Sequence, residues 1–456
     1  MSRFISTAIC ALFVCSICST VASASDSAAG KTLLSRLSFS RPSARKDQSK
    51  QGNLSADTLL SLLSKLQSGF LKLTLPNGDS KEFGNRQDNL HAEIHILNWS
   101  VFKQVLSHGD IGFAESYIRG QWNTPDLKAI LELAIRNRTI LEKAIYGKWY
   151  GSLIYRLKHW LRDNSKSGSR KNIHAHYDLG NSFYSLWLDP SMSYSSAWFS
   201  EGDKQALADA QRAKISHILQ AINAKPGDHL LEIGCGWGGF MEEALRAGSH
   251  VTGLTLSTEQ KSFAQSRLEK VQRESSTENS YEVRLQDYRD CKEQFDGIAS
   301  IEMFEAVGEK HWAEYFQTIA ARLKRGGKAC IQTIVIAEEL FERYRHNTDF
   351  IQQYVFPGGM LPSRTSFRAY AANAGLNVEV EFAFGHDYAK TLCMWRDSFN
   401  QKLHEITQLG FDEAFIRLWN FYLMYCAAGF SERNIDVVQF TLSHQPITPS
   451  GDALRV

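Results

Sequence analysis

Residues 230–239 read Leu-Leu-Glu-Ile-Gly-Cys-Gly-Trp-Gly-Gly, an apolar run that leads into a glycine-rich turn and then into a helical pattern. Glycines let a backbone approach a ligand closely, and the N-terminus of the following helix offers free N–H groups to it. Gly234, Gly236 and Gly239 also satisfy the dinucleotide pattern G-x-G-x-x-G, and a turn of this kind can be purely structural. The stretch therefore predicts a strand–turn–helix unit and leaves its ligand open.

The sequence around this turn alternates between strand and helix patterns. Strands are expected at 229–233, 251–256, 295–301 and 328–334, and helices from residues 240, 258 and 310. This alternation predicts an α/β domain with a parallel sheet that helices cover on both faces.

The end of the second strand distinguishes between ligands. A nicotinamide dinucleotide requires an acidic residue there, about 20 residues after the turn, for its ribose. Residues 254–257 are Leu-Thr-Leu-Ser, with no acid. Glu232 instead precedes the first glycine, where a carboxylate can face the positive amino acid portion of S-adenosylmethionine. The methyl donor is therefore favoured over a dinucleotide.

Length and composition limit the other possibilities. A chain of 456 residues exceeds the usual single domain, and a net charge of +2 gives no field for wrapping nucleic acid, so no nucleic-acid partner is expected. Three of the eight cysteines lie in the first 18 residues, and the other five are scattered, which predicts neither a metal site nor a disulfide framework. After residue 25 no apolar run is long enough to span a membrane, so any membrane contact is peripheral.

Five segments are expected along the chain. They are a targeting-like or disordered segment (1–53), a small α+β domain (54–145), a basic linker (146–171), the α/β domain (172–445) and a tail (446–456). In the small domain, 70–75 alternates into the turn 76–79, and Thr124-Pro125 predicts the N-cap and first turn of a helix. The linker carries six basic residues against one acid over 156–171, which indicates either a solvated surface or contact with anionic lipid headgroups.

The N-terminus and the cysteine pattern predict different cellular compartments. Arg3, the apolar run 4–14 and Ala22-Ser23-Ala24 match the parts of a secretory signal peptide, with an organellar transit segment or a misassigned start codon as alternatives. The cysteine pattern of the body is typical of a reducing compartment. We expect a cytoplasmic protein that is peripheral on the inner membrane.

From about residue 58 to 445 the chain resembles the cyclopropane-fatty-acyl-phospholipid synthase family of S-adenosylmethionine-dependent enzymes. The resemblance rests on the order and spacing of six motifs: His176-Tyr177-Asp178-Leu179-Gly180-Asn181, Met192-Ser193-Tyr194-Ser195, the turn 233–239, Met303-Phe304-Glu305, Phe356-Pro357-Gly358-Gly359 and Tyr388-Ala389-Lys390-Thr391-Leu392. It implies a Rossmann-like class I methyltransferase sheet and identifies the N-terminal α+β domain as similar to the lipid-associated domain of the bacterial phospholipid-acting members.

The resemblance also implies an activity, which is transfer of a methylene or methyl group from S-adenosylmethionine to the double bond of an unsaturated phospholipid acyl chain, forming a cyclopropane. Loss of a different proton would stop at a methylated or methylene acyl chain, and a lipid-binding protein without activity is a third possibility. A membrane surface of unsaturated phospholipids is the implied partner, and a homodimer is left open.

The resemblance also implies, position by position, which residues bind the methyl donor. With Glu232 from the argument above, they are Tyr194, Ser195, Gly234, Gly236, Gly238, Thr255, Leu256, Gln260, Gln286, Asp287 and Tyr288. Alternative roles are left open for two of them: Leu256 could be an ordinary core residue and Tyr288 a surface aromatic.

Ring closure needs a base, and in the family a bound bicarbonate ion serves. The five positions that hold it read here Ser196, Glu305, Gln332, Ile334 and Tyr388. The family's Cys and His are replaced at 196 and 332, and Ala306 replaces a further His. Ser and Gln still donate hydrogen bonds to an anion.

The carbocation that methyl transfer creates must be kept from water, and aromatic faces stabilise it. Candidates for that lining, each of which could instead be core, are Trp198, Phe199, Tyr344, Phe350, Tyr354, Phe356 and Trp395.

Overall fold

The computed structural model describes residues 49–145, 179–275, 279–347, 349–356 and 358–446. The expected signal-like segment, the basic linker 146–171, the His176-Tyr177-Asp178 part of its motif and nearly all of the tail lie outside the described residues.

The N-terminal domain is a small sheet with helices packed on it. Its elements are α2 (Ser49–Leu63), β1 (Phe70–Thr74), β2 (Ser80–Gly84), β3 (His91–Ile96), α3 (Ser100–Ile118), β4 (Trp122–Asn123), α4 (Leu127–Arg136) and α5 (Arg138–Ile145), with strand order β2-β1-β3-β4. Alternation in β1 buries Leu71 and Leu73 on one face. Helix α2 begins inside the segment expected to be targeting-like or disordered, so that boundary is wrong by a few residues.

The second domain is built on a seven-stranded sheet, in the order β10-β11-β9-β8-β5-β6-β7. Its strands are β5 (His229–Ile233), β6 (His250–Thr255), β7 (Tyr281–Leu285), β8 (Phe295–Ile301), β9 (Leu323–Ile336), β10 (Leu376–Ala383) and β11 (Ile435–His444). Its helices are α8 (Asn181–Tyr184), α9 (Leu207–Ala221), α10 (Gly239–Arg246), α11 (Thr258–Ser275), α12 (Trp312–Arg322), α13 (Glu338–His346), α14 (Phe350–Tyr354), α15 (Arg364–Asn373), α16 (Gly385–Gln401), α17 (Leu403–Gln408) and α18 (Glu413–Ser431), with short 3-10 turns at Tyr288–Asp290, Phe304–Ala306 and Glu309–His311.

Helices cover both faces of this sheet, as the α/β pattern predicts. Neighbouring residues of β5 point to opposite sides: Leu230 packs with α9, α10 and α11, and Leu231 packs with α12 and α15. The expected cover of helices on both faces of the sheet is thereby confirmed.

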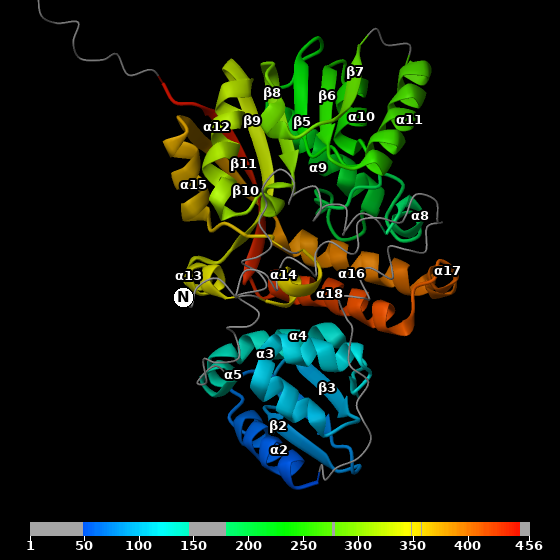
Figure 1. The fold of residues 1–456 in the computed structure, drawn as a ribbon, viewed down its shortest axis with the longest axis vertical. Coiled ribbons are helices and arrows are strands. Elements are labelled where there is room, and N and C mark those ends of the chain that lie inside the picture. The colour runs from blue at the N-terminus through cyan, green and yellow to red at the C-terminus, as the bar shows by residue number, and fades with distance from the viewer. Residues whose placement is uncertain (1–48, 146–178, 276–278, 348, 357, 447–456) are drawn as a thin grey trace, which may run out of the picture.

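The four strands expected from the sequence are parallel to one another, as predicted, and one further strand of the sheet, β11, is antiparallel to its neighbours. Strands β5 to β9 pair in parallel, whereas β11 runs antiparallel to both β9 and β10. The reason lies in α16 and α18, which run out from the sheet and back again (Figure 1), so the chain returns to the edge it left and β11 begins beside the end of β10.

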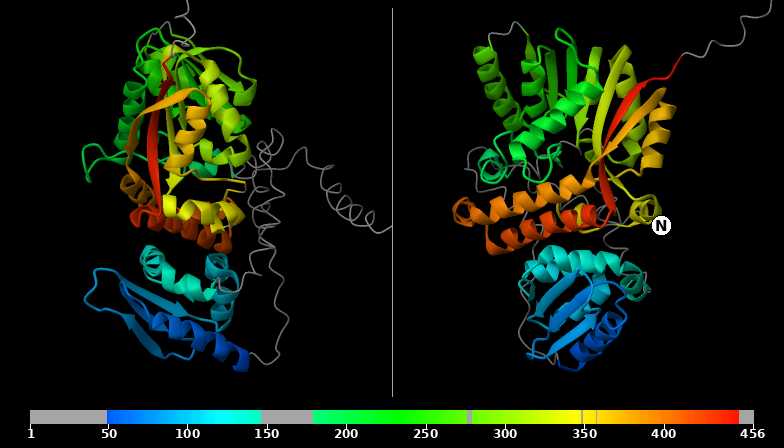
Figure 2. Two further views of the ribbon diagram at one scale, coloured as in Figure 1. Left: turned by 90° about the vertical axis from the view of Figure 1, so that its left-hand side faces the viewer. Right: turned by 180° about the vertical axis from the view of Figure 1, so that it is seen from behind.

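Helices α16 and α18 lie between the sheet and the N-terminal domain in all three views (Figures 1 and 2). Helix α18 packs on α3 and α4, and the Arg417 guanidinium donates to the carbonyls of Tyr117 (2.6 Å) and Trp122 (2.8 Å). Arg136 and Glu432 form an ion pair of 2.8 Å across the same boundary. The two domains therefore share a packed interface.

No helix in the described part of the chain is both long and apolar enough to cross a membrane. Within the same residues no group of three or more His, Cys, Asp and Glu side chains could hold a metal ion.

Candidate active site

A cavity of about 170 Å³ lies at the carboxyl ends of β5, β6 and β8, the edge where ligands bind in α/β sheets. Of the twelve positions expected to bind the methyl donor, eleven line it: Tyr194, Ser195, Glu232, Gly234, Gly236, Thr255, Leu256, Gln260, Gln286, Asp287 and Tyr288. Gly238 is not among the lining residues. It lies at the start of α10, where an added Cβ would come within 3.0 Å of Ala264, so its role is to let two helices pack.

The glycines of the turn serve different purposes. All three of Gly234, Gly236 and Gly238 have positive φ, which other residues rarely adopt. A Cβ on Gly234 would lie 2.8 Å from the Met303 side chain, whereas a Cβ on Gly236 would meet nothing within 4 Å. Gly236 therefore keeps the cavity itself open.

Glu232 gives the cavity an acidic wall. The residue is buried, and its Oε2 has no hydrogen-bond partner within the described residues. Burial raises the pKa of this carboxyl well above its usual range, and Lys214 opposes that rise. A buried, unpartnered carboxyl oxygen suits a cationic ligand, so these residues fit the positively charged end of S-adenosylmethionine.

Lys214 lines the same cavity and places a basic group close enough to Glu232 to oppose the rise of its pKa. Its Nζ donates to Ser195 Oγ (2.7 Å) and Gln211 Oε1 (2.6 Å), and burial lowers its pKa to about 8. The sequence reasoning did not include this lysine, whose position on α9 carries no motif.

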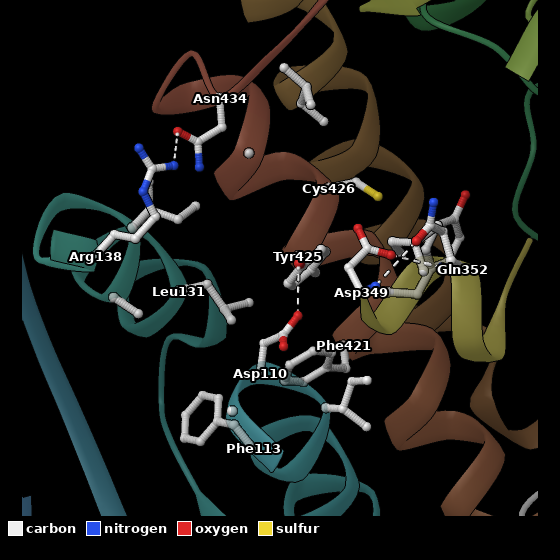
Figure 3. A pocket seen from close by; sticks show the side chains of 18 of the residues that line it. Asp110, Phe113, Leu131, Arg138, Asp349, Gln352, Phe421, Tyr425, Cys426 and Asn434 are labelled. Carbon is white, nitrogen blue, oxygen red and sulfur yellow. Dashed lines mark hydrogen bonds between the residues drawn. The ribbon is translucent and has the colours of Figure 1, made fainter. Parts of the chain in front are cut away.

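A second cavity, of about 620 Å³, is lined mainly by apolar side chains from both domains. Figure 3 shows Phe113 of α3, Leu131 of α4 and Phe421 and Tyr425 of α18 around it, with the Tyr425 hydroxyl donating to Asp110 at 3.3 Å. Its wall continues into the interior of the N-terminal domain, through Leu71, Leu73 and Ile94 among others.

The two cavities meet at three residues. Tyr194, Glu302 and Ala306 line both of them. A ligand in the small cavity and an apolar chain in the large one would therefore come together beside the Glu302 carboxylate.

Glu302 was missed by the sequence reasoning, and it gathers three of the five residues expected to hold an anion. Its Oε1 accepts from the Ser196 backbone N–H and from Gln332 Nε2, both at 2.8 Å, and its Oε2 accepts from the Tyr388 hydroxyl at 2.5 Å. These residues come from a loop, from β9 and from α16.

The other two expected residues form a separate contact. Glu305 Oε1 accepts from the Ile334 N–H at 2.6 Å, and Glu305 Oε2 is buried with no hydrogen-bond partner in the part of the chain described. Burial and the neighbouring Glu302 charge raise the pKa of Glu305 to about 8. Tyr388 donates to Glu302, and among the described residues no hydrogen bond joins it to Glu305.

The aromatic expectation is only partly right. Tyr344 and Phe356 line the large cavity, whereas Trp198, Phe199, Phe350, Tyr354 and Trp395 do not. Trp395 and Phe350 are fully buried in the core beneath it. Helix α18 supplies the aromatic wall instead, with Phe421, Tyr422, Tyr425 and Phe430, because its apolar face is shared between the domains.

Comparison with known proteins decides the family. The family model described as mycolic acid cyclopropane synthetase matches residues 164–440. The chain belongs to this family. It is therefore an S-adenosylmethionine-dependent methyltransferase of the cyclopropane and methyl fatty acid synthases.

Relatives of this family cover most of the chain. Tuberculostearic acid methyltransferase UfaA1 of Mycobacterium tuberculosis is 36% identical over 361 residues, which are 75% of this chain and 81% of that protein. Cyclopropane-fatty-acyl-phospholipid synthase of Escherichia coli is 35% identical over 356 residues, 77% of this chain and 88% of the relative. The solved structure of mycolic acid cyclopropane synthase CmaA1 with SAH and CTAB aligns with a TM-score of 0.55 at 33% identity, over 60% of this chain and 97% of the other.

Proposed function

We propose that this methyltransferase acts on the double bond of an unsaturated acyl chain carried by a membrane phospholipid and closes a cyclopropane ring. The observation that carries the proposal is the meeting of the two cavities at Tyr194, Glu302 and Ala306. A large apolar cavity that opens on the methyl-donor site suits a long hydrocarbon substrate. Its volume, about 620 Å³, lies within the usual range of about 300–1,000 Å³ for ligand pockets.

The chemistry explains why the cavity is apolar. A double bond is a poor nucleophile, so it must be held against the activated methyl group with water excluded. When bound, S-adenosylmethionine supplies that methyl group. The cation left on the acyl chain is stabilised by aromatic faces such as Tyr194 and Tyr422, which line the cavity and hydrogen-bond to each other at 2.8 Å.

The polar end of the lipid has a candidate position too. Arg138, which donates to Asn434 at 3.3 Å (Figure 3), and the exposed Arg343 line the large cavity. Guanidinium groups bind phosphate well, so the phosphodiester is proposed to lie near them. Arg343→Ala should then raise the lipid concentration that gives half-maximal rate without changing S-adenosylhomocysteine affinity.

A second outcome, an acyl chain that is methylated without a ring, is favoured by one comparison. The relative that is 36% identical is named a tuberculostearic acid methyltransferase. In this version a neighbouring chain proton is lost, and a partner reductase would saturate the product.

Expression in a host without such enzymes, followed by mass spectrometry of its fatty acids, tests both outcomes. A gain of one CH₂ with loss of the double bond supports the ring, and the same gain with retained unsaturation supports the alternative. The protein is also purified, and quenching of its tryptophan fluorescence by S-adenosylhomocysteine shows that it binds the donor product. If it binds S-adenosylhomocysteine but the fatty acids of the host are unchanged, the lipid assignment is contradicted.

Membrane contact is part of the proposal. The basic linker between the domains is proposed to bind anionic headgroups, with the protein peripheral on the cytoplasmic face of the inner membrane. Reversing Lys166, Arg170 and Lys171 to Glu, or adding about 0.5 M salt, should weaken co-sedimentation with liposomes, because salt screens exposed charges. Unchanged co-sedimentation in both cases would refute the role of the linker.

A further inference from the structure

Glu302 is held in an unusual backbone conformation. Its φ is +50°, in the left-handed region that favours glycine, and its N–H donates to the Gln332 carbonyl at 2.7 Å. Residues other than glycine keep such a conformation only when their surroundings hold it, and these positions concentrate at functional sites. The residue that bears this backbone strain carries a carboxylate.

The surroundings of that carboxylate form an anion site made by the chain. Three donors converge on its two oxygens, from Ser196, Gln332 and Tyr388. Gln332 is itself oriented, because its Oε1 accepts from Gln439 Nε2 at 2.9 Å and so its Nε2 must face Glu302.

These three donors belong to the set that the family resemblance assigns to bicarbonate. In this chain they already bind a side-chain carboxylate, so the residues present do not fit a free ion at those donors. Glu302 also lies at the junction of the two cavities, beside the atoms that would react.

We propose that the Glu302 carboxylate is the chain's own proton acceptor and takes the place of a free bicarbonate ion. The proposal rests on the proposed acyl-chain function and holds for either product, since both require loss of one proton.

The electron pair of the double bond forms a bond to the donated methyl carbon as that carbon's bond to sulfur breaks, which leaves a cation on the other alkene carbon. A proton then passes from the methyl carbon to Glu302, and the C–H electrons form the last ring bond. Loss of a chain proton next to the cation instead gives a methyl-branched alkene. A hydride shift from the methylated carbon onto the cation, followed by loss of a methyl proton, gives the methylene product. Glu302 returns its proton to water once the donor cavity, which it also lines, is vacated.

Protonation states of the neighbours agree with this role. Burial raises the pKa of Glu302, although the hydrogen bonds from Tyr388, Ser196 and Gln332 oppose that rise. A carboxylate whose pKa is raised by burial is a stronger base than an exposed glutamate, and a proton next to a carbocation is strongly acidic, so the transfer is favourable. Burial and the Glu302 charge raise the pKa of Tyr388, which therefore remains a donor.

The test compares full-length wild type with Glu302→Gln, Glu302→Gly and a control, Glu132→Gln, which removes a buried carboxylate of α4 outside both cavities. Glycine at 302 accepts the positive φ, so that variant should fold. Each protein is titrated with ¹³C-bicarbonate by NMR and with S-adenosylhomocysteine by calorimetry. Turnover on unsaturated phospholipid vesicles is measured in CO₂-free buffer with and without added bicarbonate.

We expect wild type and Glu132→Gln to bind no bicarbonate and to turn over equally in both buffers. Glu302→Gln should keep its S-adenosylhomocysteine affinity within about threefold and lose about 10²- to 10⁴-fold in turnover, the usual contribution of a positioned base. Glu302→Gly should gain bicarbonate binding and recover part of its rate when bicarbonate is added.

Wild type that binds bicarbonate and slows in CO₂-free buffer would overturn the proposal, as would Glu302→Gln with near-normal turnover. If wild type transfers no methyl group to any acyl chain, the proposed function fails, and the bicarbonate titrations still judge whether Glu302 occupies the anion site.

Discussion

Replacing Gly236 by Ala tests whether the glycine-rich turn is shaped by a ligand or only by folding. An alanine Cβ there would meet no protein atom within 4 Å, and Gly236 itself lines the methyl-donor cavity. The backbone is already in the left-handed region at φ +51°, so the variant should fold with a cost of about 1–2 kcal/mol.

The expected effect on binding is larger than the effect on folding. Placing an extra methyl group in a filled site costs about 1–3 kcal/mol. That cost corresponds to a dissociation constant for S-adenosylhomocysteine about 5- to 150-fold higher than that of the wild type. Gly236→Val, as the bulkier change, should abolish binding.

Gly227→Ala is the matched control. Gly227 also has positive φ (+88°) and open space around its Cβ position, but it lies before β5 and outside both cavities. Calorimetric titration and thermal unfolding of both variants separate binding from stability. If Gly236→Ala binds within twofold of the wild type, or if Gly227→Ala loses as much affinity, the turn does not approach the donor as argued.

Three further outcomes are expected. Glu305→Gln should have a higher free energy of unfolding than the wild type, and the difference should grow from about pH 5 to 8. The reason is that the folded pKa of about 8 lies above the ordinary value of 4.5, so the folded state disfavours the charged form over this range. Urea unfolding measures the difference, and a difference that shrinks with pH would contradict the shift. Leu131→Trp narrows the apolar cavity and should move preference toward shorter acyl chains in a mixed-vesicle assay, with donor affinity unchanged; an unaltered chain-length profile would place the acyl chain elsewhere. Arg417→Ala removes charged hydrogen bonds to Tyr117 and Trp122 worth about 1.5–3 kcal/mol each and should separate unfolding of the two domains into two transitions, whereas a single unshifted transition would show that apolar packing alone joins them.

The fold could be predicted where the signal is local. Strands such as β5 and β6 are short apolar runs flanked by glycine turns and amphipathic helices, and the parallel order follows from that alternation. The direction of β11 could not be predicted from the sequence, because it depends on how α16 and α18 pack together. The N-cap of α4 was also misplaced: Asp126 caps the helix by accepting from Ala129 N–H, while Thr124 donates to the Glu93 carbonyl, a contact between distant segments.

The methyl-donor site was more predictable than the large cavity because its residues belong to local sequence motifs. Gly234 and Gly236 directly follow β5, and Thr255 and Gln260 lie at the end of β6 and in the first turn of α11, so their motifs are contiguous in sequence. The lining of the large cavity depends on the interface between the domains, and the sequence offered no pattern that would favour Tyr422 over Trp395.

Glu302 shows where residue-by-residue comparison reaches its limit. Two glutamates stand three residues apart at the end of β8, and only the folded chain shows that the first accepts from Ser196, Gln332 and Tyr388. Gln332 and Ala306, which stand where the family has histidines, then follow from one change, the replacement of a free anion by the Glu302 carboxylate. A free anion can be balanced by histidines that take up a proton, whereas a fixed carboxylate surrounded by neutral donors already carries its charge. Gln332 supplies such a donor, and Ala306 leaves the junction of the cavities open beside the carboxylate. Restoring histidine at 332 alone should preserve the Glu302 site, because a neutral imidazole can accept from Gln439 on one ring nitrogen while it donates to Glu302 from the other.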